Sequence, residues 1–352
     1  MWGARPSRSR TRSAAVREAI ARSRALSKLR RRGALVHALP PAVHRPGARA
    51  RLAGSLYSGA IVELRPGTTE RAVDVVARDA GVSGRVGAFR ASTAGGLVTE
   101  VRTASGERAI LRAAGAGWPG DPAAAADALT LLASAGAPAP RLLGRGVIAG
   151  ASWTLETFCT GTRPRRLDPT MATTLASIAA RLPQREGRAG AQARDLDRVA
   201  AALPHLADRI GSVRALMGSV DAPAILRHGD LWLGNVLAGA GGVFIVDWEG
   251  WAPDGFPGAD LLHLIATERR IDARTDMGAV WRANPWRDAD FRRIAAPYWR
   301  AIGWQPSDEE GERIGIAWWA AEIAGTLARV PERADDARWV AVNVENVLAD
   351  SS

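Results

Sequence analysis

The sequence predicts an α+β protein, with a small antiparallel sheet in its first part and a mainly helical second part. Between Arg85 and Phe158, short strand-like apolar runs alternate with turn residues around one helical stretch. After Gly161 the spacing becomes helical, except for a hairpin within residues 231–247. The chain has 352 residues, 47% of them hydrophobic, which is enough for two lobes with sizeable cores.

In the first part, we expect strands and helices in a regular order. Ala72, Val73, Val76 and Ala80 recur on one face and predict a helix after a capping threonine. Ser105-Gly106 marks the turn between two strands. The expected elements are strands at 59–64, 85–91, 97–103, 107–111, 147–149 and 152–158, with helices at 68–80 and 123–135.

In the second part, the apolar spacing predicts a series of helices around the hairpin. Their expected ranges are 168–182, 194–220, 258–269, 287–302, 307–329 and 331–349. Seven of the thirteen tryptophans lie between Trp281 and Trp339, and a stripe of this kind is typical of helix packing. The acids after Ser307 are expected to cap a helix start.

The net charge of +11 belongs to the N-terminal segment. Residues 1–52 hold thirteen arginines, Lys28 and one acid, Glu18, whereas the remainder is nearly neutral. We expect a disordered or partly helical extension. A nucleic-acid or anionic-membrane contact and a transit peptide remain alternatives.

Two residue counts exclude whole classes of chemistry. Lys28 is the only lysine, so the body can form no Walker A loop and no lysine Schiff base. Cys159 is the only cysteine, which excludes a disulfide framework and favours a reducing, cytoplasmic location. No apolar run approaches the ~20 residues of a membrane span.

The motif with the clearest chemistry is Arg227-His-Gly-Asp-Leu-Trp-Leu-Gly-Asn235, followed by Phe244-Ile-Val-Asp-Trp-Glu249. Gly239-Ala-Gly-Gly242 joins two apolar runs and predicts a hairpin that returns Asp247 to the side of Asn235. With Asp230, two carboxylates and an amide then converge, and such oxygen ligands suit a hard cation such as Mg²⁺. Phosphoryl transfer requires this kind of arrangement.

The motif resembles that of the aminoglycoside phosphotransferase/choline kinase-like family, a branch of the two-lobed protein-kinase-like fold. The resemblance runs over about residues 67–350, although only residues 226–264 are specific. His-Gly-Asp-Leu-Trp also resembles fructosamine kinases, but Asp-Trp-Glu fits the aminoglycoside phosphotransferase branch better.

The resemblance implies a role for each matching residue. It makes Asp230 the catalytic base, Asn235 and Asp247 the magnesium ligands, and His228 and Asp260 structural supports of the loop. Glu156-Thr-Phe158 resembles the linker whose backbone meets the adenine, so Glu156 and Phe158 are predicted at the nucleotide.

The first part departs from the family's pattern. Arg112 stands where the family has a phosphate-binding lysine; arginine can bind phosphate bidentately, or Arg112 is an ordinary strand-end residue. The usual helix glutamate is missing, which leaves Asp121 or Asp127 as partners for Arg112. Gly95 and Gly96, in the loop 92–96, resemble the phosphate-covering loop.

The sequence therefore predicts an ATP- or GTP-dependent, Mg²⁺-dependent kinase of small-molecule hydroxyl groups, with a sugar, glycoside or amino alcohol as acceptor. Its lobes are expected at 53–160, which binds nucleotide, and at 161–352, which holds the catalytic loop and substrate site. The alternative is a nucleotide-binding pseudokinase or regulatory protein without transfer activity. The Arg112 replacement motivates that alternative.

Overall fold

The computed structural model describes residues 72–85, 90–91, 97–115, 122–148, 151–218 and 220–351. The predictions for residues 1–52, for the strand at 59–64 and for the glycine loop at 92–96 lie outside these ranges. The described residues form two compact units. The first contains residues up to 126 and 142–158, and the second contains 127–141 and the residues from 159 onward.

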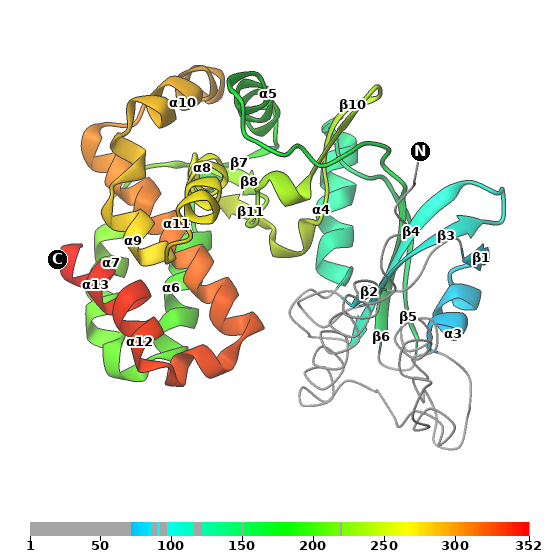
Figure 1. Ribbon diagram of the computed structural model, residues 1–352, viewed down its shortest axis with the longest axis horizontal. Helices are drawn as coiled ribbons and strands as arrows, with labels where there is room; N and C mark the ends of the chain where they lie inside the picture. Colours follow the sequence, from blue (N-terminus) through cyan, green and yellow to red (C-terminus); the bar gives the residue numbers. More distant parts are fainter. Residues whose placement is uncertain are drawn as a thin grey trace, which may run out of the picture. The chain divides into compact units, whose positions relative to one another are not determined.

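An antiparallel sheet dominates the first unit (Figure 1). Its described strands are β1 (Val82–Arg85), β2 (Arg90–Ala91), β3 (Leu97–Thr103), β4 (Arg108–Gly115), β5 (Leu142–Ile148) and β6 (Ala151–Thr157). They pair in the order β1-β3-β4-β6-β5, with β2 also on β3. The predicted turn between β3 and β4 is confirmed, with the Gly106 amide donating to the Thr103 carbonyl at 2.9 Å.

The two faces of this sheet differ in polarity because neighbouring residues on a strand point to opposite sides. One face packs against α3 (Ala72–Asp79): Val76 of this helix lies in a buried apolar cluster with Val101, Ala109, Leu111, Trp153 and Leu155 of the sheet. The Trp153 indole donates to Asp79 at 2.7 Å. The opposite face of β6 carries buried polar side chains at Ser152, Thr154 and Glu156.

Strand β5 begins earlier than the predicted 147, at Leu142. Gly144 and Gly146 lie in this added stretch, and glycines carry no side-chain pattern to indicate a strand. A Cβ atom at Gly146 would lie 2.7 Å from the Trp153 ring. Glycine is therefore required where β5 crosses this indole.

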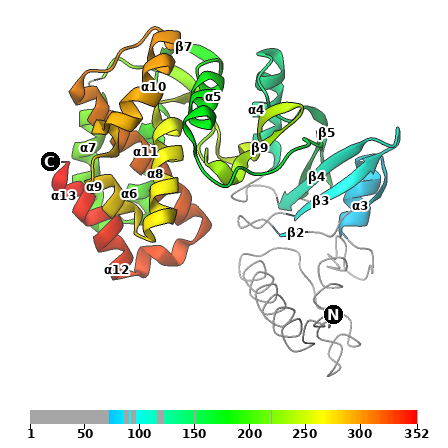
Figure 2. The same ribbon diagram turned by 45° about the horizontal axis from the view of Figure 1, so that its top comes forward.

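Helices form most of the second unit, as predicted (Figure 2). Its long helices are α5 (Pro169–Ala179), α6 (Ala191–Ala202), α7 (Ala207–Gly218), α8 (Ala259–Ala273), α10 (Ala289–Ile302) and α11 (Asp308–Arg329). Helix α11 packs against α6 and α8. The Ser307 hydroxyl and the Glu310 carboxylate form a capping box at its start, as the sequence indicated. None of the described helices has the length and apolar character needed to cross a bilayer.

The helical stretch expected over 194–220 is two helices, α6 and α7. The break falls at Leu203-Pro204, because proline has no amide to continue the hydrogen-bond ladder. The predicted hairpin is confirmed as β9 (Val236–Gly239) and β10 (Gly242–Ile245).

A three-stranded antiparallel sheet, with order β11-β8-β7, was not predicted. Its strands are β7 (Gln184–Arg188), β8 (Pro223–Arg227) and β11 (Ala252–Gly255). Strand β7 is exposed at every position, and β11 reads Ala-Pro-Asp-Gly, so neither has an alternating apolar pattern. This sheet positions the motif, because β8 ends at Arg227, directly before His228.

Candidate active site

The loop after β8 is built around the fully buried ring of His228. Its Nδ1 accepts a hydrogen bond of 3.1 Å from the Asp230 amide. Nε2 must therefore carry the proton, and it lies 3.0 Å from the Val246 carbonyl oxygen. The ring also meets Trp248 edge-on, with centroids 4.5 Å apart. His228 thus joins the loop to the end of the β9–β10 hairpin.

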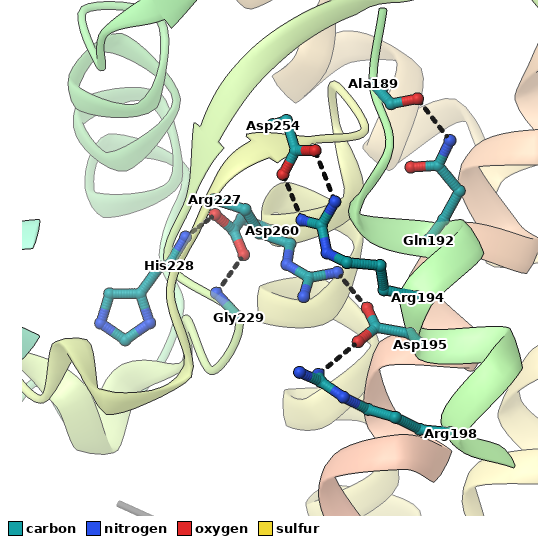
Figure 3. A network of polar contacts seen from close by, with 10 residues as sticks. All are labelled: Ala189, Gln192, Arg194, Asp195, Arg198, Arg227, His228, Gly229, Asp254 and Asp260. Atoms are coloured by element: carbon teal, nitrogen blue, oxygen red, sulfur yellow. Dashed lines mark hydrogen bonds and ion pairs between the residues drawn. The ribbon is translucent and has the colours of Figure 1, made fainter. Parts of the chain in front are cut away.

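Asp260 holds the backbone of the same loop (Figure 3). Its carboxylate accepts from the His228 amide at 2.6 Å and from the Gly229 amide at 3.0 Å. Gly229 adopts φ +82°, and a Cβ there would lie 2.1 Å from the Gly250 carbonyl oxygen. The loop therefore requires glycine between His228 and Asp230.

Asn235 fixes one oxygen of the Asp230 side chain. The amide Nδ2 donates to the Asp230 carbonyl at 2.8 Å and to its Oδ2 at 3.1 Å. Asn235 is 6% exposed, whereas 38% of the Asp230 side chain is accessible. The Asp230 carboxylate is therefore accessible to solvent while one of its oxygens is fixed by Asn235.

The environment of Asp230 favours the ionised carboxylate. Burial acts to raise its pKa, but hydrogen bonding and charge from His263, with further charge from His228 and Arg329, outweigh burial. The net result is a pKa below the usual range of an aspartate. An ionised carboxylate at neutral pH can accept a proton.

Asp247 returns to this loop through the hairpin. The Val246 amide donates to the Asn235 carbonyl at 2.9 Å, so the residue after Val246 follows directly beside the asparagine. Asp247 itself adopts φ +70°, a left-handed conformation that aspartate tolerates better than most residues. The backbone thereby brings Asn235 and Asp247 to neighbouring positions.

Asn235 and Asp247 offer oxygen atoms that suit a magnesium ion. The Asn235 nitrogen is engaged by Asp230, which leaves Oδ1 as the amide atom that could bind a cation. Over the described part of the chain, no group of three or more His, Cys, Asp or Glu side chains could hold a metal alone. Mg²⁺ is usually bound by one or two protein ligands together with water and substrate phosphates, and one amide oxygen with one carboxylate fits that pattern.

An ion-pair network with one buried pair links α6 to the strands next to the loop (Figure 3). Arg227 Nη1 lies 2.6 Å from Asp195 Oδ2, and both side chains are at most 8% exposed. Arg194, on the same helix α6, pairs with Asp254 of β11 at 2.7 Å. None of these four residues was assigned a role from the sequence, although Arg227 is the first residue of the motif. The network fastens α6 to the sheet from which the loop emerges.

Helix α8 supplies two further contacts that the sequence did not predict. His263 lies on it one turn after Asp260 and is 3.5 Å from Asp230 Oδ1. Glu268 interacts with the Leu233 backbone; burial raises the pKa of Glu268 above its usual value, as does the charge of Asp272. In the sequence, only the spacing of three residues between Asp260 and His263 could have indicated that both lie on one face of a helix.

In the first unit, Arg112 pairs with Glu156. Arg112 Nε is 3.2 Å from Glu156 Oε1, with side-chain exposures of 12% and 4%. The buried Thr154 hydroxyl donates to the same carboxylate oxygen at 3.1 Å. The partners expected for Arg112 were Asp121, which lies outside the described residues, and Asp127, whereas Glu156 was expected in the linker. The alternation of polar residues along β6, at Ser152, Thr154 and Glu156, is the feature of the sequence that could have indicated this pairing.

Phe158 is the other described residue that was predicted at the nucleotide. Phe158 follows β6, donates its amide to the Arg108 carbonyl at 3.3 Å, and packs under the Arg108 guanidinium at 3.7 Å. The first unit ends at this residue. Gly95 and Gly96 fall outside the described residues.

Residues 89–303 match the sequence profile of the phosphotransferase enzyme family. No curated protein sequence is similar enough to count as a match. The fold is similar to that of a fructosamine-3-kinase candidate from Haemophilus somnus, at 14% identity and a TM-score of 0.52, covering 79% of this chain and 95% of that one.

It is also similar to an amicoumacin kinase in complex with AMP-PNP, Ca²⁺ and amicoumacin, at 13% identity and a TM-score of 0.51, covering 80% and 94%. An aminoglycoside phosphotransferase of Streptomyces rimosus, in complex with ADP and streptomycin, matches at 19% identity and a TM-score of 0.46, covering 71% and 96%. The predicted kinase-like fold is thus confirmed.

Proposed function

The chain belongs to the phosphotransferase enzyme family and is a small-molecule phosphotransferase; we propose that it transfers the γ-phosphoryl group of ATP, with Mg²⁺, to a hydroxyl of its substrate. Asp230 is the general base. The observation that carries this proposal is the accessible Asp230 carboxylate, held by Asn235 beside the returning Asp247. An amino alcohol, sugar or glycoside is the proposed acceptor class, and GTP is the alternative donor.

In the proposed step, the acceptor oxygen attacks the γ-phosphorus while its proton passes to Asp230. A new P–O bond forms, the bond to the β-phosphate oxygen breaks, and ADP leaves with that electron pair. Asn235 Oδ1 and Asp247 would hold the Mg²⁺. The ion would neutralise charge on the phosphate oxygens. His228 and Asp260 keep the loop in place without touching the reacting atoms.

For the nucleotide, we assign Arg112 to the phosphates, with Glu156 orienting its guanidinium. We also propose that Gly95 and Gly96 bind the phosphates and that Phe158 lies at the adenine. The nucleotide-binding lobe is assigned to 53–160 and the catalytic and substrate lobe to 161–352. The single cysteine, Cys159, favours a cytoplasmic enzyme.

Binding of Mg-ATP should stabilise the wild-type protein and not the Asp247→Ala variant. At a ligand concentration ~100-fold above Kd, the expected gain is about 2.7 kcal/mol. Thermal unfolding with and without Mg-ATP measures it. Asp221→Ala is the matched control, because the Asp221 side chain is 79% exposed in a surface pair with Arg188. An equal gain in Asp247→Ala would contradict its role as a magnesium ligand.

A transfer assay then separates the two functions that the sequence left open. Mg-ATP stabilisation together with ADP release that depends on an added alcohol supports the kinase. Stabilisation without phosphoryl transfer to any sugar, glycoside or amino alcohol tested would instead favour the nucleotide-binding pseudokinase.

Replacing Arg112 should weaken nucleotide binding. Hydrogen bonds to charged groups contribute ~1.5–3 kcal/mol, so Kd for ATP should rise at least about tenfold. The double variant Arg112→Met/Glu156→Gln leaves no buried unpaired carboxylate, and Glu156→Gln alone is its reference. Calorimetric titration with ATP gives the Kd values. Arg112→Lys keeps the positive charge and should retain most of the affinity for ATP. If the Kd of the double variant equals that of Glu156→Gln, Arg112 is an ordinary strand residue.

A further inference from the structure

The second oxygen of the Asp230 carboxylate faces a buried histidine. His263 is 5% exposed, and its Nε2 lies 3.5 Å from Asp230 Oδ1. Asn235 donates to the other oxygen, Oδ2. The carboxylate is therefore contacted on both oxygens, by an amide from the loop and an imidazole from α8.

The neighbours of His263 determine which nitrogen carries its proton. Trp318 Nε1, which can only donate, lies 3.3 Å from Nδ1, so in the neutral ring the proton belongs to Nε2. Glu322 Oε2 lies 3.6 Å from the same Nδ1 and favours the doubly protonated ring. In both forms Nε2 bears a proton, which Asp230 Oδ1 at 3.5 Å and the Thr267 hydroxyl at 3.4 Å can share.

Helix α8 contacts the loop at two points one turn apart. Asp260 accepts from the His228 and Gly229 amides, and His263 follows three residues later on the same face. Helix α11 supports this face through Trp318 and Glu322, whose side chain is 14% exposed. The position of His263 is thus set by two helices rather than by the loop.

We propose that His263 is a positioning residue for Asp230, holding Oδ1 through its Nε2–H group while Asn235 holds Oδ2. The two contacts fix the rotation of the carboxylate about its Cβ–Cγ bond. This inference rests on the proposed function, because it matters for catalysis only if Asp230 is the base. Glu322 and Trp318 orient the imidazole from its other side.

The kinetic test compares His263→Leu with His263→Gln. A small misplacement of a catalytic group can cost up to ~100-fold, so we expect kcat to fall roughly 10- to 100-fold in His263→Leu. KM for both substrates should stay nearly constant. Glutamine can place an N–H where Nε2 stood, so His263→Gln should recover most of kcat. Equal losses in both variants, or a loss confined to KM, would overturn the proposal.

Two controls separate positioning from packing. Thr267→Val changes a neighbour whose hydroxyl lies 3.4 Å from the same Nε2, and kcat should stay unchanged. In the Asp230→Asn background, His263→Leu should cause no further loss, because its effect passes through Asp230. A full additional loss there, or a loss in Thr267→Val as large as in His263→Leu, would show a packing role.

Crystal structures of the wild type and both His263 variants keep the inference testable if no acceptor is phosphorylated. The carboxylate rotation should be retained in His263→Gln and lost in His263→Leu. Absence of transfer with this structural result would refute the proposed function and leave the contact established. An unchanged carboxylate in His263→Leu would overturn the inference whatever the activity.

Discussion

Asp230→Asn should reduce kcat by ~10²–10⁴, the usual contribution of a general base. The amide cannot take the proton of the acceptor hydroxyl. Nucleotide binding should be nearly unchanged, because the proposed phosphate and magnesium contacts come from Arg112, Asn235 and Asp247. ADP formation with a phosphorylated acceptor measures the effect, and calorimetric titration measures binding.

The control for this variant is Asp290→Asn, the same change at an aspartate whose side chain is 70% exposed and pairs with Arg293. It should leave kcat unchanged. If Asp230→Asn retains wild-type turnover while binding ATP normally, Asp230 is not the base. A parallel unfolding curve for each variant ensures that the comparison concerns folded protein.

Asp195→Asn should lower the free energy of unfolding by about 3–5 kcal/mol, because it removes one member of a buried ion pair. The Arg227 guanidinium would remain almost fully buried without its carboxylate at 2.6 Å. Arg227 Nε already has no hydrogen-bond partner within the described ranges. Urea denaturation at neutral pH measures the loss.

Asp197→Asn is the matched control on the same helix. Asp197 pairs with Arg214, but both side chains are more than half exposed, so its removal should cost about 0–1 kcal/mol. The double variant Asp195→Leu/Arg227→Met removes both charges and should recover most of the stability. Equal losses in Asp195→Asn and Asp197→Asn would mean that the buried pair adds nothing beyond a surface contact.

The two predictions concern two different parts of the site: the carboxylate of the loop and the ion pair that supports the loop. Asp230 is the proposed base, whereas Asp195 has no proposed contact with substrate and acts through Arg227, the residue before His228. We therefore expect Asp195→Asn to change stability strongly, and kcat only through the fraction of folded protein.

Local sequence patterns were sufficient for the motif itself. The spacing from His228 to Asn235, the glycine at 229 and the Gly-rich turn at 239–242 predicted both the tight loop and the hairpin that returns Asp247. These features depend on neighbouring residues, whose backbone preferences act over a few positions. For the same reason, the acidic residues after Ser307 predicted the capped start of that helix.

Secondary-structure elements without an apolar pattern could not be predicted from the sequence. Strands β7 and β11 are held by pairing with β8, and their own residues are exposed or turn-forming. The break between α6 and α7 was signalled by Pro204 but hidden by helical spacing on both sides.

The sequence by itself indicated the family, through the resemblance of its motif, and the fold class, through the spacing of its apolar residues; the roles of the site residues stay predictions. The tertiary structure decided which side chains hold them. Glu156 reaches Arg112 because β4 and β6 are neighbours in the sheet. His263 lies near Asp230 on one side and near Glu322 on the other, because α8 packs on α11. Such contacts depend on how separate elements pack together, and no local preference of the chain specifies that packing.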